Sequence, residues 1–142
     1  MNIKRLLLAI VAGYVVIFAT DMLIHEVWMK ADYEATRQLW RPESEMGSYM
    51  AWMIGAQLLS VITFVILWAK GFAGRTSNIA CAVGYGLLMG LFSGVWAIVL
   101  YVILPMPCEI ACKWFFAGIV QCILLAIVTL YVYKPNEPVT AP

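Results

Sequence analysis

Four long apolar runs are the feature of this sequence that most limits what it can fold into. They cover roughly residues 6–29, 49–69, 78–104 and 110–133. A helix needs about 20 residues to cross the hydrocarbon core of a bilayer, and a helix in a soluble core seldom stays apolar on every side for this long. We therefore predict an all-α polytopic membrane protein, with four transmembrane helices in one antiparallel bundle and a single domain over residues 1–142.

The composition agrees with a membrane protein and excludes some partners. Hydrophobic residues make up 64% of the 142 residues and charged residues only 12%, whereas a soluble domain has about a quarter charged residues. The formal net charge is +1 and the sequence has no basic run, so no nucleic-acid partner is expected. The lipid bilayer is the partner that the composition predicts.

The start of the chain, MNIKRLLLAIVAGYVVIFAT, resembles a signal peptide, because two cations precede an apolar stretch. We interpret it as a signal anchor that forms the first span. The segment at 30–48 is long enough for a helix that lies along the membrane interface. Pro42 suits the first turn of the next helix, which would then begin before residue 49.

The cations give an orientation. Five Lys and Arg fall on the side of the N-terminus and four on the other side, and only one acidic residue falls on the first side: Lys4, Arg5, Lys70, Arg75 and Lys134; Lys30, Arg37, Arg41 and Lys113; Glu137. The positive-inside rule favours N-in and C-in, and we expect the bacterial inner membrane.

Small residues at a spacing of four mark the faces on which helices pack closely in lipid. The third and fourth spans carry such faces and are joined by the short proline turn PMPCE, so we expect the two faces to meet in an antiparallel hairpin. Cys122 is then a small packing residue rather than a reactive thiol. The predicted packing residues are Gly86, Gly90, Gly94, Gly118 and Cys122.

One segment, TDMLIHEVWMK at 20–30, carries charge where the first span is still apolar. At 1.5 Å per residue, Asp21 lies about 22 Å above Leu6 and so about 8 Å short of the far edge of a ~30 Å core. His25 and Glu26 then lie near that edge. The same arithmetic puts Gln57 about 12 Å below Tyr49, a level close to that of Asp21.

All four spans carry a polar residue at this level, and Tyr14, Asp21 and His25 also share one stripe of the first helix. Two interpretations stay open. The side chains can hydrogen-bond across helices and fix the bundle, or they can line a small outward-facing pocket, because an intramembrane Asp indicates function. The predicted polar set is Tyr14, Asp21, His25, Gln57, Ser93 and Gln121.

No cofactor is predicted outright, but a metal site is one hypothesis. Asp21 and His25 are one turn apart, as are Cys108 and Cys112 on the fourth span. First and fourth helices are usually neighbours in such a bundle, and imidazole and thiolate are good ligands for zinc or copper. A disulfide between the two cysteines is the alternative, although cysteines four apart in a helix are poorly oriented for it.

Four motifs, LWRPESEM, YVILPMP, KWFFAGIVQ and YVYKP, resemble a family of small bacterial four-span membrane proteins of unknown function. The resemblance rests on a His that ends the first span and on a Trp-Arg-Pro element before the second, which His25, Trp40, Arg41 and Pro42 match. It implies the four-span architecture and no activity.

The sequence thus favours a non-enzymatic accessory or assembly subunit of a larger inner-membrane complex, in contact with other membrane subunits. The alternative is a homo-oligomeric transporter or binding protein for a small solute or metal ion, built around Asp21 and His25. A haem held by two histidines is excluded, because the chain has one histidine.

Overall fold

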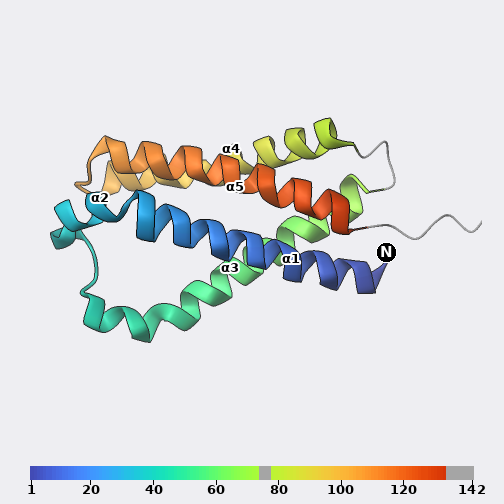
Figure 1. Ribbon diagram of the computed structural model, residues 1–142. Coiled ribbons are helices and arrows are strands. Elements are labelled where there is room, and N and C mark those ends of the chain that lie inside the picture. Colours follow the sequence, from blue (N-terminus) through green and yellow to red (C-terminus); the bar gives the residue numbers. More distant parts are fainter. Residues whose placement is uncertain (74–77, 134–142) are drawn as a thin grey trace, which may run out of the picture.

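The computed structural model describes residues 1–73 and 78–133, and nearly all of them lie in helices (Figure 1). In chain order these are α1 (Ile3–Asp21), the π-helical segment η1 (Met22–Trp28), α2 (Lys30–Ala35), the 3-10 turn η2 (Arg37–Leu39), α3 (Glu43–Gly71), α4 (Ile79–Ile103) and α5 (Cys108–Val132). Four helices are long and apolar enough to cross a membrane: α1 with η1, α3, α4 and α5. The predicted all-α, four-span fold is confirmed.

The helix ends follow from local sequence. Asn2 and Asn78 cap α1 and α4, each accepting a hydrogen bond from the backbone N–H three residues on, at 3.2 and 2.9 Å. These bonds satisfy amides that have no partner inside the helix. Helices α3 and α5 follow Pro42 and Pro107, and each has a glutamate in its first turn, where the helix dipole favours negative charge.

Different elements lie at the two ends of the molecule. The first residues of α1 and the last residues of α5 lie at one end, which we call the terminal end (Figure 1). Helix α2 lies at the opposite end, which we call the α2 end. Three residues used for the predicted orientation, Arg75, Lys134 and Glu137, lie outside the described residues.

Helices α4 and α5 form the closest pair. A Cβ atom added at Gly90 would lie 2.6 Å from the Cα of Ile119, and one added at Gly86 would lie 2.6 Å from the Cα of Ile123. Gly94 faces the Phe115 ring in the same way. Only glycine lets the two backbones approach this closely.

Gly118 has a different place from the one predicted. A Cβ atom added there would meet nothing within 4 Å, so this residue does not help to bring α4 and α5 together. Spacing alone suggested otherwise, but α5 presents Ile119 and Ile123 to the glycines of α4. Cys122 is half-buried beside this contact, and its backbone carbonyl oxygen faces Gly86.

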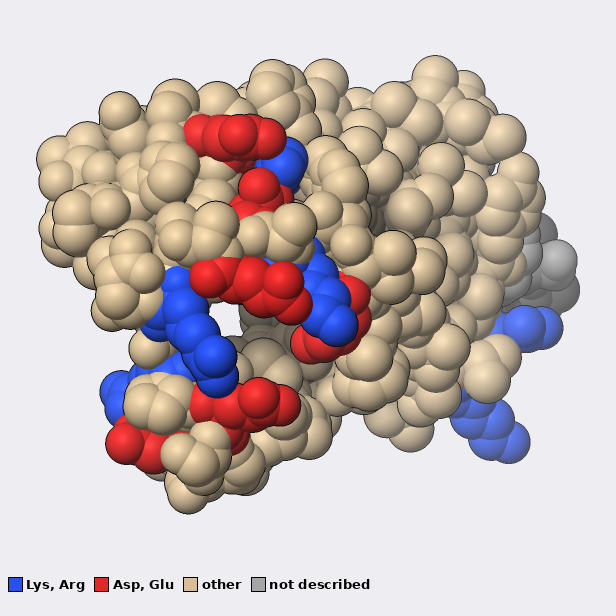
Figure 2. All heavy atoms as spheres, turned by 60° about the vertical axis from the view of Figure 1, so that its left-hand side comes forward, with Lys and Arg blue, Asp and Glu red and all other residues tan. Residues whose placement is uncertain are grey.

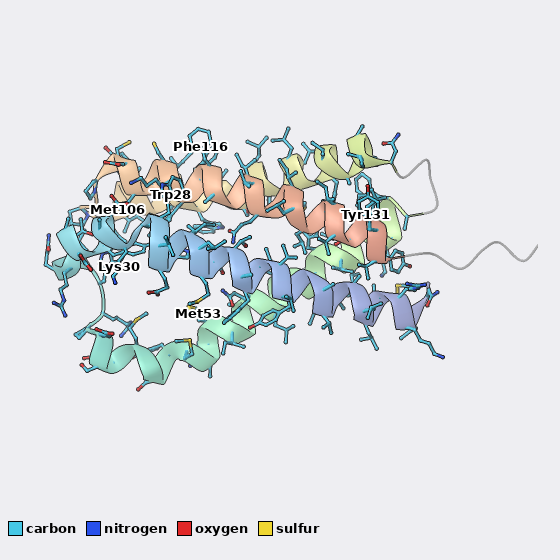
Figure 3. All side chains as sticks on the ribbon, in the orientation of Figure 1. Trp28, Lys30, Met53, Met106, Phe116 and Tyr131 are labelled. Atoms are coloured by element: carbon cyan, nitrogen blue, oxygen red, sulfur yellow. The ribbon has the colours of Figure 1, made fainter. Side chains whose placement is uncertain are left out.

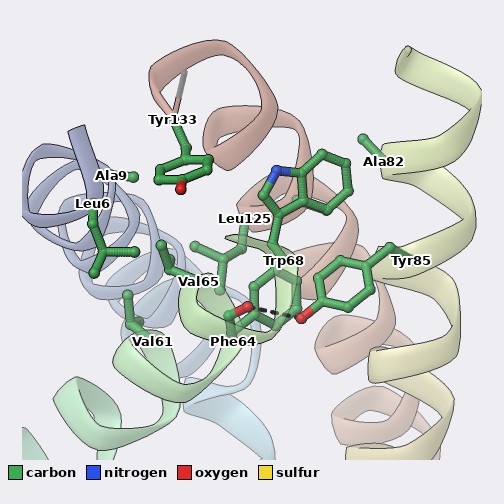
Figure 4. Packing of buried hydrophobic residues seen from close by; sticks show 11 residues of the cluster. Leu6, Ala9, Val61, Phe64, Val65, Trp68, Ala82, Tyr85, Leu125 and Tyr133 are labelled. Atoms are coloured by element: carbon green, nitrogen blue, oxygen red, sulfur yellow. Dashed lines mark hydrogen bonds between the residues drawn. The ribbon is translucent and has the colours of Figure 1, made fainter. Parts of the chain in front are cut away.

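The main apolar core lies toward the terminal end, where all four long helices contribute (Figure 4). Trp68 of α3 is fully buried there, and its ring packs against Tyr85 of α4 with centroids 5.4 Å apart. The Tyr85 hydroxyl donates a 2.7 Å hydrogen bond to the carbonyl of Phe64. This bond and the packed rings hold the second half of α3 against α4.

The first half of α3 has no such neighbours. Every residue from 43 to 60 is exposed except Gln57, and the helix diverges from α1 toward the α2 end (Figure 1). The bundle is therefore closed at the terminal end and open on the side of α3 at the α2 end. The helical pattern of the sequence did not predict this opening.

A second, smaller cluster closes the α2 end on the side of α4 and α5. Met29, just before α2, is fully buried against Met106 and Ile110 at the α4–α5 turn. The predicted helix in the first loop is therefore present, as the six residues of α2 followed by η2, and the segment that carries it is anchored to the end of the hairpin.

Candidate polar site at the α2 end

Asp21 is the last residue of α1 and lies where three helices meet. Its carboxylate accepts hydrogen bonds from Nε2 of Gln57 on α3 and from Nε2 of Gln121 on α5, the latter at 2.6 Å. The Gln121 amide also donates to Oγ1 of Thr20 at 2.9 Å. Three of the six predicted polar residues are thus in direct contact, and they tie α1 to both α3 and α5.

The charge of Asp21 has no cationic partner among the described residues, whose ion pairs both involve Lys113. An ionised Asp facing lipid near mid-membrane costs about 2.5–3.5 kcal/mol. Two amide donors offset part of this cost, because hydrogen bonds to a charged group are stronger than those between neutral groups. The cluster is therefore a partly buried carboxylate held by neutral donors.

Gln57 is only partly satisfied. Its Oε1 atom is buried and has no hydrogen-bond partner in the described part of the chain. Buried carbonyl oxygens are paired in the great majority of cases, so this one marks an acceptor for which the described residues supply no donor.

His25 makes no hydrogen bond or ion pair with Asp21 in the described residues, although the two are four apart in the sequence. Residues Met22–Trp28 form a π-helix, and the N–H of Met29 bonds the carbonyl of Ile24, five residues back, at 2.8 Å. The wider turn changes which residues share a face, and π-helical turns are common at functional sites. The His25 ring stacks on Tyr33, with centroids 5.8 Å apart.

Tyr33 is the centre of a second polar group. Its hydroxyl lies 2.6 Å from Nδ1 of His25 and accepts a 2.8 Å hydrogen bond from Nε1 of Trp114. The hydroxyl also donates to Sδ of Met29 at 3.6 Å. Burial raises the pKa of Tyr33, and the carboxylates of Asp32, Asp21 and Glu26 raise it further, against the Trp114 bond.

An ion pair fixes the loop above these groups. Nζ of Lys113 lies 2.7 Å from Oδ2 of Asp32 and 2.9 Å from Oε1 of Glu109. Lys113 thus joins the first turn of α5 to α2. Trp40 closes the cluster by packing edge-on against both Tyr33 and Trp114.

Two small cavities separate η1 from α5. One of about 260 Å³ is lined by Ile24, His25, Trp114, Ala117 and Gln121. The other, of about 280 Å³, is almost wholly apolar and reaches from Trp28 past Gln121 to Leu124. Gln121 lines both, so the polar site and the membrane-facing side of the bundle meet at this residue.

Two predicted members of the polar set lie elsewhere. Tyr14 stacks on Phe18 of its own helix, with centroids 6.3 Å apart, and the structure gives it no bond to Asp21. Ser93 is exposed on α4, where its hydroxyl bonds the carbonyl of Gly90 at 3.2 Å. Equal depth did not bring Ser93 to the cluster, because depth fixes a level along the membrane normal and not a direction around the helix. Tyr14 was predicted from its stripe on the first helix, but it lies seven residues, about 10 Å, before Asp21.

The predicted metal ligands are not brought together. In the described ranges, no group of three or more His, Cys, Asp and Glu side chains is placed to hold a metal ion. Cys108 and Cys112 are free thiols with sulfur atoms 3.8 Å apart on an exposed face of α5, while the His25 ring is bonded to Tyr33. The zinc or copper hypothesis for His25, Asp21, Cys108 and Cys112 therefore has no support in this arrangement.

Thr20, Tyr33 and Trp114 are members of the site that the sequence did not indicate. Thr20 adjoins Asp21, so adjacency was a usable signal. No local pattern links Tyr33 with Trp114, 81 residues away. Their contact depends on how α2 docks against α5.

The fold and this cluster define the class of protein: a four-span, all-α membrane protein with a partly buried carboxylate shared among three helices. No family model, curated protein or solved structure matches the chain. The resemblance to small bacterial four-span proteins of unknown function stays a prediction.

Proposed function

We propose that this chain is a non-enzymatic accessory or assembly subunit of a larger complex in the bacterial inner membrane, with both termini on the cytoplasmic side. The observation that carries the proposal is the first half of α3. Seventeen of the eighteen residues from 43 to 60 are exposed, all but Gln57, although α3 packs well in its second half.

A helix in lipid gains stability by close packing with other helices. The first half of α3 has the composition for such packing, because Gly47, Ala51 and Gly55 recur at a spacing of four and no atom lies within 4 Å of a Cβ built at either glycine. A helix from another subunit would find on this small-residue face of α3 a surface for close backbone packing.

The test is native mass spectrometry of the protein released from its own membranes with a mild detergent. We expect a complex with larger membrane subunits. A variant with Gly55→Leu should lose these subunits, while Gly84→Leu, an exposed glycine on α4 that also has open space beside it, should retain them. Recovery of the wild type as a homo-oligomer alone would contradict the proposal.

A second candidate function has one observation in its favour. Acidic and basic side chains gather around an opening at the α2 end, on the side where α3 has diverged from α1 (Figure 2). Asp21 of α1 and Gln57 of α3, whose Oε1 is unpaired, connect the same two helices. This arrangement suits a homo-oligomeric transporter or binding protein for a small cation or polar solute, and solute uptake by vesicles that contain only this protein would favour it.

A further inference from the structure

The Asp21–Gln57 pair lacks a specific kind of partner. An ionised carboxylate only accepts hydrogen bonds, so the Gln57 amide must present Nε2 to Asp21, and Oε1 is left as the unpaired atom. Turning the amide over would only exchange the buried unpaired oxygen for a buried unpaired nitrogen. The group missing from this place is a hydrogen-bond donor, and a positively charged donor would also neutralise Asp21.

The face of α3 that continues from Gln57 is lined with methionine. Met46, Met50 and Met53 precede Gln57 by steps of four, three and four, which places all four on one side of the helix. Because Gln57 bonds Asp21, this side faces α1. Figure 3 shows Met53 in the space between the two helices.

These methionines have no partner that buries them. Met46, Met50 and Met53 are 42%, 43% and 45% exposed. Methionine side chains are flexible and polarizable, and they are used on surfaces that adapt to a partner helix. The open side of α3 is therefore an apolar, adaptable surface that leads down to the partly buried carboxylate of Asp21.

The described long helices of a second copy of this chain offer no free Lys or Arg at the level of Asp21. Within the described long helices, the cationic residues are Lys4, Arg5 and Lys70 near the terminal end and Lys113 near the α2 end. Lys113 is already engaged by Asp32 and Glu109. A Lys or Arg that reaches this place from a transmembrane helix would therefore come from a different protein.

We infer that Asp21 and Gln57 form the acceptor half of an intramembrane pair, whose donor half is a Lys or Arg on a transmembrane helix of a partner protein. That helix packs on the methionine face of α3 and places its basic side chain at the level of Asp21. Ionisable residues inside membranes are usually paired with one another. The inference rests on the proposed subunit role and names the chemistry of the partner.

The probe is a synthetic leucine-rich transmembrane helix with one Lys a third of the way along, compared with the same helix carrying Leu at that position. Both are mixed with the purified protein in phosphatidylcholine vesicles, and association is measured by energy transfer. We expect the Lys helix to bind about tenfold more tightly than the Leu helix. Asp21→Asn should abolish this preference, and Asp21→Glu should retain it.

Circular dichroism and gel filtration establish that each variant is folded. Met50→Glu puts a charge on the apolar face of α3 and should weaken the binding of both the Lys helix and the Leu helix. Equal binding of the Lys and Leu helices, or a preference that survives Asp21→Asn, would overturn the inference. So would Na⁺ binding that depends on Asp21 without any preference for the Lys helix. If the native complex persists unchanged in Asp21→Asn, the pairing is wrong while the subunit role stands.

Discussion

At the scale of single residues, Asp21 has the most consequence. Its carboxylate accepts hydrogen bonds from the side-chain amides of Gln57 and Gln121, which lie 36 and 100 residues further along the chain on two other helices. It ties α1 to α3 and α5, and it has no ion-pair partner in the described part of the molecule. Structure and candidate function depend on the same atom group.

A substitution at Gln121 measures how much the hydrogen bonds between Asp21 and its neighbouring helices contribute to stability. Gln121→Met keeps the length of the side chain but removes the donor to Asp21 and Thr20. We expect the free energy of unfolding in a detergent titration to fall by about 1–2 kcal/mol, near the upper range of interhelical hydrogen bonds in membranes. Ser60→Ala is the control, because the Ser60 hydroxyl is exposed and bonds only its own helix. An equal loss in both variants would contradict a special role for Gln121.

We expect the local stability of the α2 end to depend on pH through the phenol of Tyr33. Its pKa is raised in the folded state, chiefly by burial, whereas in the unfolded chain it is about 10. The stabilisation from the neutral phenol is complete below pH ~10 and is lost as the pH rises through the folded-state pKa. The protection of η1 and α2 amides from hydrogen exchange, measured relative to the base-catalysed intrinsic rate, should therefore fall in alkali.

Tyr33→Phe is the matched variant. It should raise the exchange rate at neutral pH, because His25 and Trp114 lose their shared partner, and it should remove the part of the alkaline change that is due to this phenol. An alkaline response of the same size in Tyr33→Phe would show that another group is responsible.

At the scale of elements, the α4–α5 hairpin is the rigid part of the fold and α3 the open one. Gly90 sits at the closest approach of the hairpin. Gly90→Ala would put a methyl group 2.6 Å from the Cα of Ile119, so the helices must separate. We expect a loss of about 1–3 kcal/mol in the free energy of unfolding, as for an overpacked core.

Gly118→Ala on α5 is the control for this prediction. It meets open space and should be neutral or slightly stabilising, because Ala favours a helix more than Gly does. If both substitutions were tolerated equally, the close contact at Gly90 would be refuted.

At the scale of the whole molecule, the proposed N-in, C-in orientation places the α2 end outside. Cys108 and Cys112 are exposed at this end, and Cys81 lies in the first turn of α4 at the other. In intact spheroplasts, a membrane-impermeant maleimide should label single-cysteine variants that retain Cys108 or Cys112. The variant that retains Cys81 should react only after permeabilisation, and the reverse order would invert the orientation.

The sequence by itself determined the number of spans, their approximate limits and the level of the polar residues, because these depend on hydrophobic length and on the fixed rise of a helix. It also placed the start of α3 after Pro42. Asp21, Gln57 and Gln121 were found as candidates in this way.

Only the tertiary structure decided which candidates meet. The direction in which a side chain points depends on how each helix is rotated in the bundle, so Ser93 is not in contact with Asp21, whereas Thr20 shares the Gln121 amide with it. The sequence of α3 did not predict its divergence from α1 either. The same apolar residues suit a helix that faces lipid, packs in its own bundle or contacts a partner.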